Sequence, residues 1–192
     1  MRIVLLGAPG SGKGTQATLM VERLGLPHIS TGALLRNAAK RGTDLGLKAK
    51  SIIDKGELVP DEIMSDMIEE RLGHDDVANG FILDGYPRNL DQAKSLDDML
   101  ERLGQAADHA IQIDVDPEQI IKRLAGRAKQ EGRADDDEEV VRNRMRVYHE
   151  KTAPVIDYYA GRGLLTHVLG DGTVEDVLER ILSILKVSHS FS

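Results

Sequence analysis

Cysteine and tryptophan are absent from this 192-residue chain, and it holds only two Phe and four Tyr. The lack of cysteine excludes disulfides, thiolate nucleophiles, iron–sulfur clusters and cysteine-ligated zinc. The scarcity of aromatic rings means that the core must be aliphatic, and 41% hydrophobic residues supply enough apolar mass for one. At this length we expect one main domain.

Long apolar runs are also missing. The purest ones, residues 3–6 and 181–185, last four or five positions, whereas a membrane-spanning helix needs roughly 20. The first run is also too short for a signal peptide, and glycine follows it. We therefore expect a cytoplasmic protein with no membrane partner.

Positive charge is in short supply, because 25 Lys and Arg stand against 32 Asp and Glu, a net charge of −7. So acidic a chain is poorly suited to duplex nucleic acid, and we expect no nucleic-acid partner. Residues 122–146 reverse the balance, with eight basic and six acidic side chains. One arginine-rich stretch in an acidic protein favours a small anionic ligand.

Short aliphatic runs alternate with helical patterns along the chain. We expect strands at 2–6, 27–30, 80–83, 109–113 and 164–169. The spacing predicts helices at 12–24, 31–40, 45–54, 62–72, 90–103, 117–125, 138–160 and 173–185, the seventh kinked near Pro154. This alternation predicts an α/β fold, a parallel sheet with helices on both faces. Segments 30–59 and 126–137 fit that core poorly, so we expect them at the periphery.

A glycine-rich segment, Gly7-Ala8-Pro9-Gly10-Ser11-Gly12-Lys13-Gly14-Thr15, separates the first predicted strand from the first predicted helix. Such a turn lets successive backbone N–H groups face one anion at a helix N-terminus. Lys13 adds a charge for the terminal phosphates, and a nearby hydroxyl can reach a phosphate or Mg²⁺. The general motif has Ser or Thr directly after the lysine, whereas Gly14 takes that place here.

A carboxylate, Asp84, closes the apolar run at 81–83. Open parallel sheets bind ligands at the carboxyl ends of their strands, so Asp84 is suited to hold Mg²⁺ through water. Capping of the following helix is the alternative.

Three arginines also draw attention. Arg144 falls within the apolar arc of its predicted helix, where it needs a ligand or an internal salt bridge. Arg123 and Arg127 are four positions apart and share a helix face, although a solvated face remains an alternative. The acidic run at 135–139 is most simply a favourable start for a helix.

Taken together, these motifs resemble the adenylate kinase family of nucleoside monophosphate kinases, over essentially the whole chain. The resemblance rests on GAPGSGKGT at 7–15, STGALLR at 30–36, DGYPRNLDQA at 84–93, the spacing of Arg123, Arg127 and Arg133, and RNRMRVYHEKTAP at 142–154. Glycine after the lysine is that family's own variant. Ala33, however, stands where many members have an acidic residue.

The resemblance implies a P-loop NTPase fold of three α/β/α layers around a five-stranded parallel sheet. It implies a core at 1–29, 60–125 and 137–192, a small helical insertion at 30–59 that binds the nucleoside monophosphate (NMP), and a short lid at 126–136. A short lid without cysteine implies that no zinc is bound. We also expect a monomer.

The implied activity is reversible, Mg²⁺-dependent phosphoryl transfer between ATP and AMP that yields two ADP, as part of adenine nucleotide homeostasis. The implied ATP-binding residues are Gly10, Ser11, Gly12, Lys13, Gly14, Thr15, Arg123, Arg127 and Gly172. The implied AMP-binding residues are Thr31, Arg36, Glu57, Leu58, Val59, Gly85, Tyr86, Pro87, Arg88, Gln92, Arg133 and Arg144. Catalytic roles fall to Lys13, Arg88, Arg123, Arg133 and Arg144, and metal binding to Asp84 with Thr15 as a further candidate.

Residue chemistry agrees with these assignments. ATP and AMP together carry about six negative charges, so several cations must meet at one point, and arginine forks suit phosphate oxygens. The acceptor is already an oxyanion, so positioning and charge stabilisation suffice without a general base. The amide of Gln92 could pair with an adenine edge, although a plain surface glutamine is equally open. Thr31 is equally open to a simple helix-capping role.

Two other functions stay open from the sequence. One is a kinase for UMP, CMP or another monophosphate, against which Thr31, Val59 and Gln92 argue only weakly. The other is a sensor that binds adenine nucleotides without turnover, which would not need the complete cationic set. A GTPase is disfavoured because Asn/Thr-Lys-x-Asp signals are absent. The six histidines show no metal-ligand spacing, and we expect them to be structural or on the surface.

Overall fold

The aliphatic runs of the sequence form a five-stranded parallel sheet in the computed structural model, which describes residues 1–132 and 136–189. Its strands are β1 (Arg2–Leu6), β2 (His28–Ser30), β3 (Phe81–Asp84), β4 (His109–Asp114) and β5 (Leu165–Leu169), in the spatial order β2-β3-β1-β4-β5. Every pairing is parallel. The predicted sheet is confirmed, with each strand end within one residue of its expected place.

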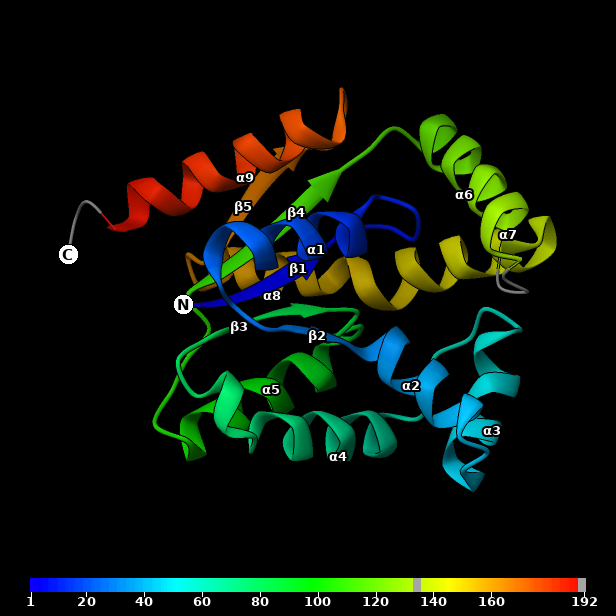
Figure 1. Cartoon of the computed structure of the whole chain (residues 1–192), viewed down its shortest axis with the longest axis horizontal. Helices are drawn as coiled ribbons and strands as arrows, with labels where there is room; N and C mark the ends of the chain where they lie inside the picture. Colours follow the sequence, from blue (N-terminus) through cyan, green and yellow to red (C-terminus); the bar gives the residue numbers. More distant parts are fainter. Residues whose placement is uncertain (133–135, 190–192) are drawn as a thin grey trace.

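Helices cover both faces of this sheet, as predicted (Figure 1). Because successive strand residues point to opposite faces, Ile3 and Leu5 pack with α1 (Lys13–Leu24) and α9 (Val174–His189). Val4 and Leu6 pack with α4 (Asp61–Leu72), α5 (Leu90–Arg102) and α8 (Ala153–Gly161) on the other side. A short 3₁₀ turn, η1 (Asp75–Val77), precedes β3. The result is a three-layer α/β/α core with an aliphatic interior.

Two pairs of helices project from the end of the sheet where the strands finish (Figure 1). One pair is α2 (Thr31–Lys40) and α3 (Asp44–Ile53), which together make up most of the predicted insertion. They touch so closely that a Cβ on Gly46 would lie 2.2 Å from the carbonyl carbon of Ala38. Thr43 caps α3 by accepting the N–H of Gly46 and donates its hydroxyl to the Ala38 carbonyl. These contacts make the two helices one rigid hairpin.

The other pair, α6 (Pro117–Glu131) and α7 (Glu138–Val147), corrects one expectation. The first of these helices was expected to end near residue 125, but it continues to Glu131. An isolated glycine such as Gly126 only weakens a helix, and the residues after it are good helix formers. Gly132, at φ 60°, ends the helix instead. About half of the segment expected as the lid is therefore helical.

The predicted break in the long helix at 138–160 is confirmed. A π-helical turn, η3 (Tyr148–Thr152), separates α7 from α8, and Pro154 occupies the first turn of α8, where its missing N–H costs nothing. Thr152 at the end of this turn donates its hydroxyl to the carbonyl of Arg88 at 2.7 Å. The turn thus connects the long helix to the end of β3.

Across the described part of the chain, no helix combines the length and the apolar character needed to cross a membrane.

Candidate active site

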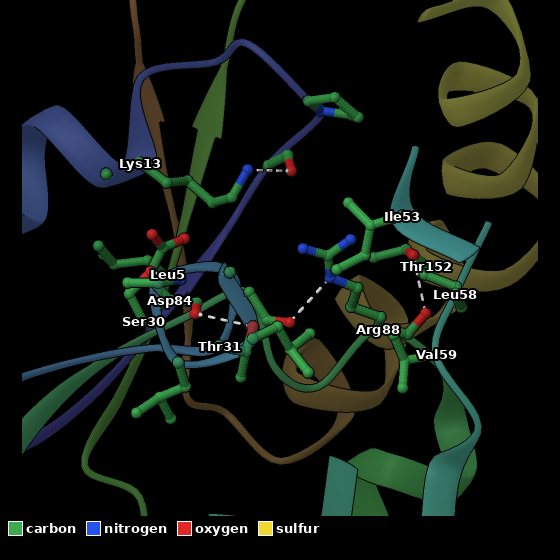
Figure 2. Close-up of a pocket in the computed structure, with 18 of the residues that line it drawn as sticks. Leu5, Lys13, Ser30, Thr31, Ile53, Leu58, Val59, Asp84, Arg88 and Thr152 are labelled. Carbon is green, nitrogen blue, oxygen red and sulfur yellow. Dashed lines mark hydrogen bonds between the residues drawn. The ribbon is translucent and has the colours of Figure 1, made fainter. Parts of the chain in front are cut away.

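A cleft of about 720 Å³ opens at the carboxyl ends of the strands. Figure 2 shows Lys13 and Asp84 on one side of it and Arg88 pointing into the same space from the other. The cleft brings together most of the predicted site residues: Gly10, Gly12, Lys13, Gly14, Thr15, Thr31, Arg36, Glu57, Leu58, Val59, Asp84, Gly85, Pro87, Arg88, Gln92, Arg127 and Arg144. Residues that are far apart in sequence thus share one cavity.

The glycine-rich loop enters the cleft in a conformation that needs glycine. Gly10 has a φ of +81°, and a Cβ there would lie 2.8 Å from Cγ of Leu124 on α6. Gly12, in the left-handed region, begins α1, and no described side chain caps that helix. The first N–H groups of α1 can therefore serve an anion, because helix N-termini combine such donors with a positive dipole.

Lys13 is half-buried between this loop and the cleft. Its Nζ donates to the carbonyls of Gly7 and Ala8 at 2.7 and 3.0 Å. Burial lowers the pKa of Lys13 to about 8, with nearby arginines adding to the effect and Asp84 opposing it. Two neutral carbonyls are weak partners for an ammonium group, so a phosphate could replace them at little cost.

Asp84 lies beside the start of α1, where a Cβ on Gly14 would be 3.6 Å from its Oδ2. Burial alone would raise the pKa of Asp84, but the His28 ring and the charges of Lys13 and Arg88 outweigh burial and lower it. The Nε2 of His28 is 3.6 Å from Oδ2, just beyond a direct hydrogen bond. The carboxylate is therefore kept ionised in the floor of the cleft.

Asp84 and Thr15 both line the cleft, and their side-chain oxygens are candidate ligands for a cation. Mg²⁺ prefers oxygen, keeps several waters, and usually takes one or two carboxylates together with substrate phosphates. One ionised carboxylate beside an anion-binding loop fits that chemistry. Among the described residues, no three His, Asp or Glu side chains gather into a complete metal-binding group.

Two arginines meet a buried carboxylate between α6 and α7. Arg127 donates to both oxygens of Asp136, at 2.6 and 2.5 Å, and Arg144 donates to Oδ1 at 2.9 Å. The side chain of Asp136 is fully buried. Burial raises its pKa, but hydrogen bonds and charge from the two arginines outweigh burial and lower it. The internal salt bridge weighed for Arg144 therefore exists.

Arg88 and Thr31 line the part of the cleft next to the end of β3. The Nε of Arg88 donates to the carbonyl of Gly85 at 2.8 Å, which leads its guanidinium toward Lys13 (Figure 2). Thr31 donates its hydroxyl to the carbonyl of Asp84 at 3.4 Å. Ser30, not Thr31, supplies the side-chain cap of α2. The capping role left open for Thr31 is therefore wrong.

The insertion touches α7 through the turn after α3. Asn143 of α7 donates its amide to the carbonyl of Lys55 at 2.7 Å. Gly56 packs so tightly that a Cβ would lie 2.8 Å from both Cγ of Arg144 and the carbonyl of Val140. The turn after α3 therefore packs directly against the helix that carries Arg144.

Gln92 lies at the start of α5 and is 2% exposed, so it is not a plain surface residue. Its Oε1 accepts the backbone N–H of Arg88, and its Nε2 donates to Asp61, both at 2.7 Å. One donor and one acceptor of the amide are thus already in use.

Four predicted site residues that the structure describes, Ser11, Tyr86, Arg123 and Gly172, are not part of the cleft lining. Ser11 and Tyr86 are buried, and the Tyr86 ring packs in the core with its hydroxyl 3.2 Å from that of Ser65. Arg123 donates to the carbonyls of Gly170 and Ser11, at 2.8 and 3.4 Å, beside the turn that carries Gly172. Arg133 lies outside the described residues.

Sequence reasoning missed His28 and Asp136. The histidine was expected to be structural or superficial, and nothing in its spacing indicates the contact with Asp84 across neighbouring strands. Asp136 belongs to the acidic run interpreted as a helix start, whereas the cap of α7 is Asp137. A charge count over residues 122–146 could have paired the buried arginines with one of those acids.

A glycine-rich loop at the head of a helix, facing a strand-end carboxylate in a parallel sheet, defines the P-loop class of nucleotide-binding proteins. The converging arginines fit an enzyme that neutralises phosphate charge during phosphoryl transfer.

Comparison with known proteins agrees with a P-loop enzyme that transfers phosphoryl groups. The family model described as "Adenylate kinase" matches residues 5–164. A curated adenylate kinase of Stenotrophomonas maltophilia (strain K279a) is 54% identical over 97% of this chain and all of its own length. That of Xanthomonas campestris pv. campestris (strain 8004) is 56% identical over 94% of this chain and 97% of its own. The chain belongs to the adenylate kinase family.

Proposed function

We propose that this protein transfers a phosphoryl group reversibly between ATP and AMP to give two ADP, and so balances the cell's adenine nucleotides. The observation that carries the proposal is the convergence of Lys13, Arg88, Arg127 and Arg144 with Asp84 in one cleft. ATP and AMP are the substrates that the family implies. We propose that the protein works as a monomer in the cytoplasm.

On the donor side, the phosphates of ATP would lie on residues 10–15, at the N-terminus of α1. Lys13 would exchange its two carbonyl partners for phosphate oxygens. Arg123 would then lie close to the adenosine end, because it bonds the carbonyls of Ser11 and Gly170, next to Gly172. Arg127 would reach the transferring phosphate from α6.

On the acceptor side, AMP would lie against the insertion and the end of β3. Arg36 and Arg88 line the cleft there and would hold the α-phosphate. Thr31, the backbone at 57–59 and the segment 85–87 would surround the nucleoside. The Tyr86 ring is buried in the core, so its contribution would come from the backbone. Arg133 belongs to this proposal from sequence alone.

Asp84 would hold Mg²⁺ through water, with Thr15 as the second candidate ligand. The ion would neutralise charge on the ATP phosphates and thereby ease the approach of a second anion. We propose no zinc. The residues themselves would align donor and acceptor and exclude water.

The two arginines that bind Asp136 would take part in the transfer step itself. A bound phosphate would compete with the Asp136 carboxylate for Arg127 and Arg144, because phosphate and carboxylate both accept bidentate hydrogen bonds from arginine. Exchange of carboxylate for phosphate would move positive charge onto the transferring group as it passes between nucleotides. No proton needs to be removed, which agrees with a cleft built from cations.

A coupled assay with ATP, Mg²⁺ and each of AMP, CMP, UMP and GMP tests the proposal. We expect rapid ADP formation with AMP, and very slow hydrolysis of ATP alone because closure over both nucleotides excludes water. Faster transfer to a pyrimidine monophosphate would overturn the choice of acceptor. Tight binding of both adenine nucleotides without any transfer would instead identify a sensor.

A further inference from the structure

The amide of Gln92 is held at both ends by groups with opposite hydrogen-bonding character. Its Oε1 accepts the backbone N–H of Arg88, and its Nε2 donates to Oδ1 of Asp61, each at 2.7 Å. The same Oδ1 accepts the side-chain amide of Asn89 at 2.9 Å, and Asn89 in turn accepts the backbone N–H of Gln92. These bonds join the starts of α4 and α5.

Only one orientation of the amide satisfies both partners. A backbone N–H can only donate, and a carboxylate can only accept. Turning the amide over would set Nε2 against the N–H of Arg88 and Oε1 against the Asp61 carboxylate. Both bonds would be lost, and the second would become a contact between two acceptors, the nearly buried Gln92 amide and the exposed Asp61 carboxylate.

The amide has one further lone pair and one further N–H that no described residue uses. Gln92 lines the cleft on the acceptor side, so this pair is available to a ligand there. Because the amide has one orientation, the positions of its remaining acceptor and its remaining donor are also set. An adenine edge offers a donor, its 6-amino group, beside a ring-nitrogen acceptor, and a hypoxanthine edge reverses them to a 6-oxo acceptor beside N1–H.

We propose that Asp61 is a specificity-positioning residue: it holds the Gln92 amide in the orientation that accepts a 6-amino purine and rejects a 6-oxo purine. The inference rests on the proposed function, because it concerns the base of the nucleotide that accepts the phosphoryl group. Asp61 acts through Gln92 and touches no substrate itself. It therefore sets the choice between acceptors and not the rate of transfer.

The experiment compares AMP with inosine monophosphate, which carries a 6-oxo group, as acceptors from ATP and Mg²⁺ in the full-length protein. Asp61→Asn keeps the size of the side chain but can both donate and accept, so it also tolerates the reversed amide. We expect the ratio of kcat/KM for AMP to that for inosine monophosphate to fall about tenfold, the cost of one lost hydrogen bond to a charged group.

Glu62→Gln is the matched control, because it removes the same charge from the next residue, which is exposed. We expect it to leave the ratio unchanged. A purely structural role of Asp61 would lower kcat/KM for both acceptors equally, so an unmoved ratio in Asp61→Asn overturns the inference. A fall of the same size in Glu62→Gln overturns it as well.

The wild-type protein supplies a measurement that needs no variant to fold. Equilibrium dialysis should show a Kd for AMP at least tenfold below that for inosine monophosphate, and equal values overturn the inference. If wild-type protein transfers phosphate to AMP while the Asp61→Asn ratio stays unmoved, the inference alone fails. If it transfers nothing to AMP, the proposed function fails, and the inference with it.

Discussion

The glycine-rich loop at 7–15 and the insertion at 30–59 face each other across one cleft, but they are held in different ways. The loop follows a fully buried strand and is pinned by α6, through Leu124 against Gly10. The insertion is a tight hairpin whose last turn rests on α7 through Gly56 and Asn143.

The cations of the cleft also differ in the groups that hold them. Lys13 rests on neutral carbonyls, whereas Arg127 and Arg144 rest on a buried carboxylate. Lys13 can therefore exchange its partners for phosphate at little cost, whereas the two arginines must give up a charged partner. Substitutions at these residues test this difference.

Lys13→Met should have the largest effect, about a thousandfold loss of kcat/KM, because the cleft loses the charge closest to the donor phosphates. Folding should change little, since the lost partners are loop carbonyls that water or the loop itself can satisfy. Steady-state kinetics and thermal unfolding check both parts. Lys122→Met, an exposed lysine on α6, is the control, and an active Lys13→Met would contradict the assignment.

Arg144→Ala should slow turnover about a hundredfold, because it removes positive charge at the transferring phosphate. Arg142→Ala, on the exposed side of the same helix and paired with Glu138, should keep normal kcat. Single-turnover measurements with ATP and AMP separate this loss from weakened binding. Full kcat in Arg144→Ala would remove the arginine from the mechanism.

Asp136→Asn should lower the free energy of unfolding by about 2 kcal/mol at neutral pH, because two arginines lose their buried counter-charge. The folded-state pKa of Asp136 is below its ordinary value. Its stabilisation is therefore present above the ordinary carboxyl pKa and is lost as pH falls through the folded value.

Urea unfolding at neutral pH and near pH 3 measures the contribution of the Asp136 carboxylate to the free energy of unfolding. The difference between wild type and Asp136→Asn should shrink at the lower pH. Asp137→Asn should stay close to wild type at both, since asparagine also caps a helix. An equal gap at the two pH values would show that the carboxylate charge is not what stabilises the arginine pair.

Gly42→Ala should give the smallest effect, and Gly56→Ala compares a second turn of the insertion with it. Both glycines have positive φ, so alanine costs about 1 kcal/mol of stability at either. Only Gly56 is crowded by α7, whereas a Cβ at Gly42 meets nothing within 4 Å. We expect about 1 kcal/mol more loss, and a raised KM for AMP, in Gly56→Ala alone. Identical losses would mean that the insertion does not depend on this contact.

The sheet could be predicted from the sequence because its strands are short aliphatic runs bounded by glycine, proline or aspartate, and such signals are local. The residue at which α6 ends could not be predicted in this way. Gly126 and Gly132 look alike in sequence, and only the second ends the helix. Which glycine ends a helix depends on the left-handed conformation that the chain adopts there, not on the residue type.

The site divides in the same way. The loop at 7–15 and Asp84 could be placed because each belongs to a motif with a defined position on a strand or helix. The pairs His28 with Asp84, Asp61 with Gln92 and Asp136 with Arg144 join different elements. Spacing along the chain carries no record of which side chains such elements bring face to face. The predicted roles of the site residues and the division into core, insertion and lid stay predictions.

The π-helical turn at Tyr148–Thr152 changes the rotation of α8 about the helix axis relative to α7. Its wider turn rotates α8 by about a quarter of a revolution relative to a continuous α-helix. That rotation lets Arg144 line the cleft while Val155 and Tyr159, a few residues later, lie in the apolar interior. Deleting one residue from this turn would leave both helices intact but remove the rotation between them. Arg144 could then no longer line the cleft while Val155 and Tyr159 stay in the core.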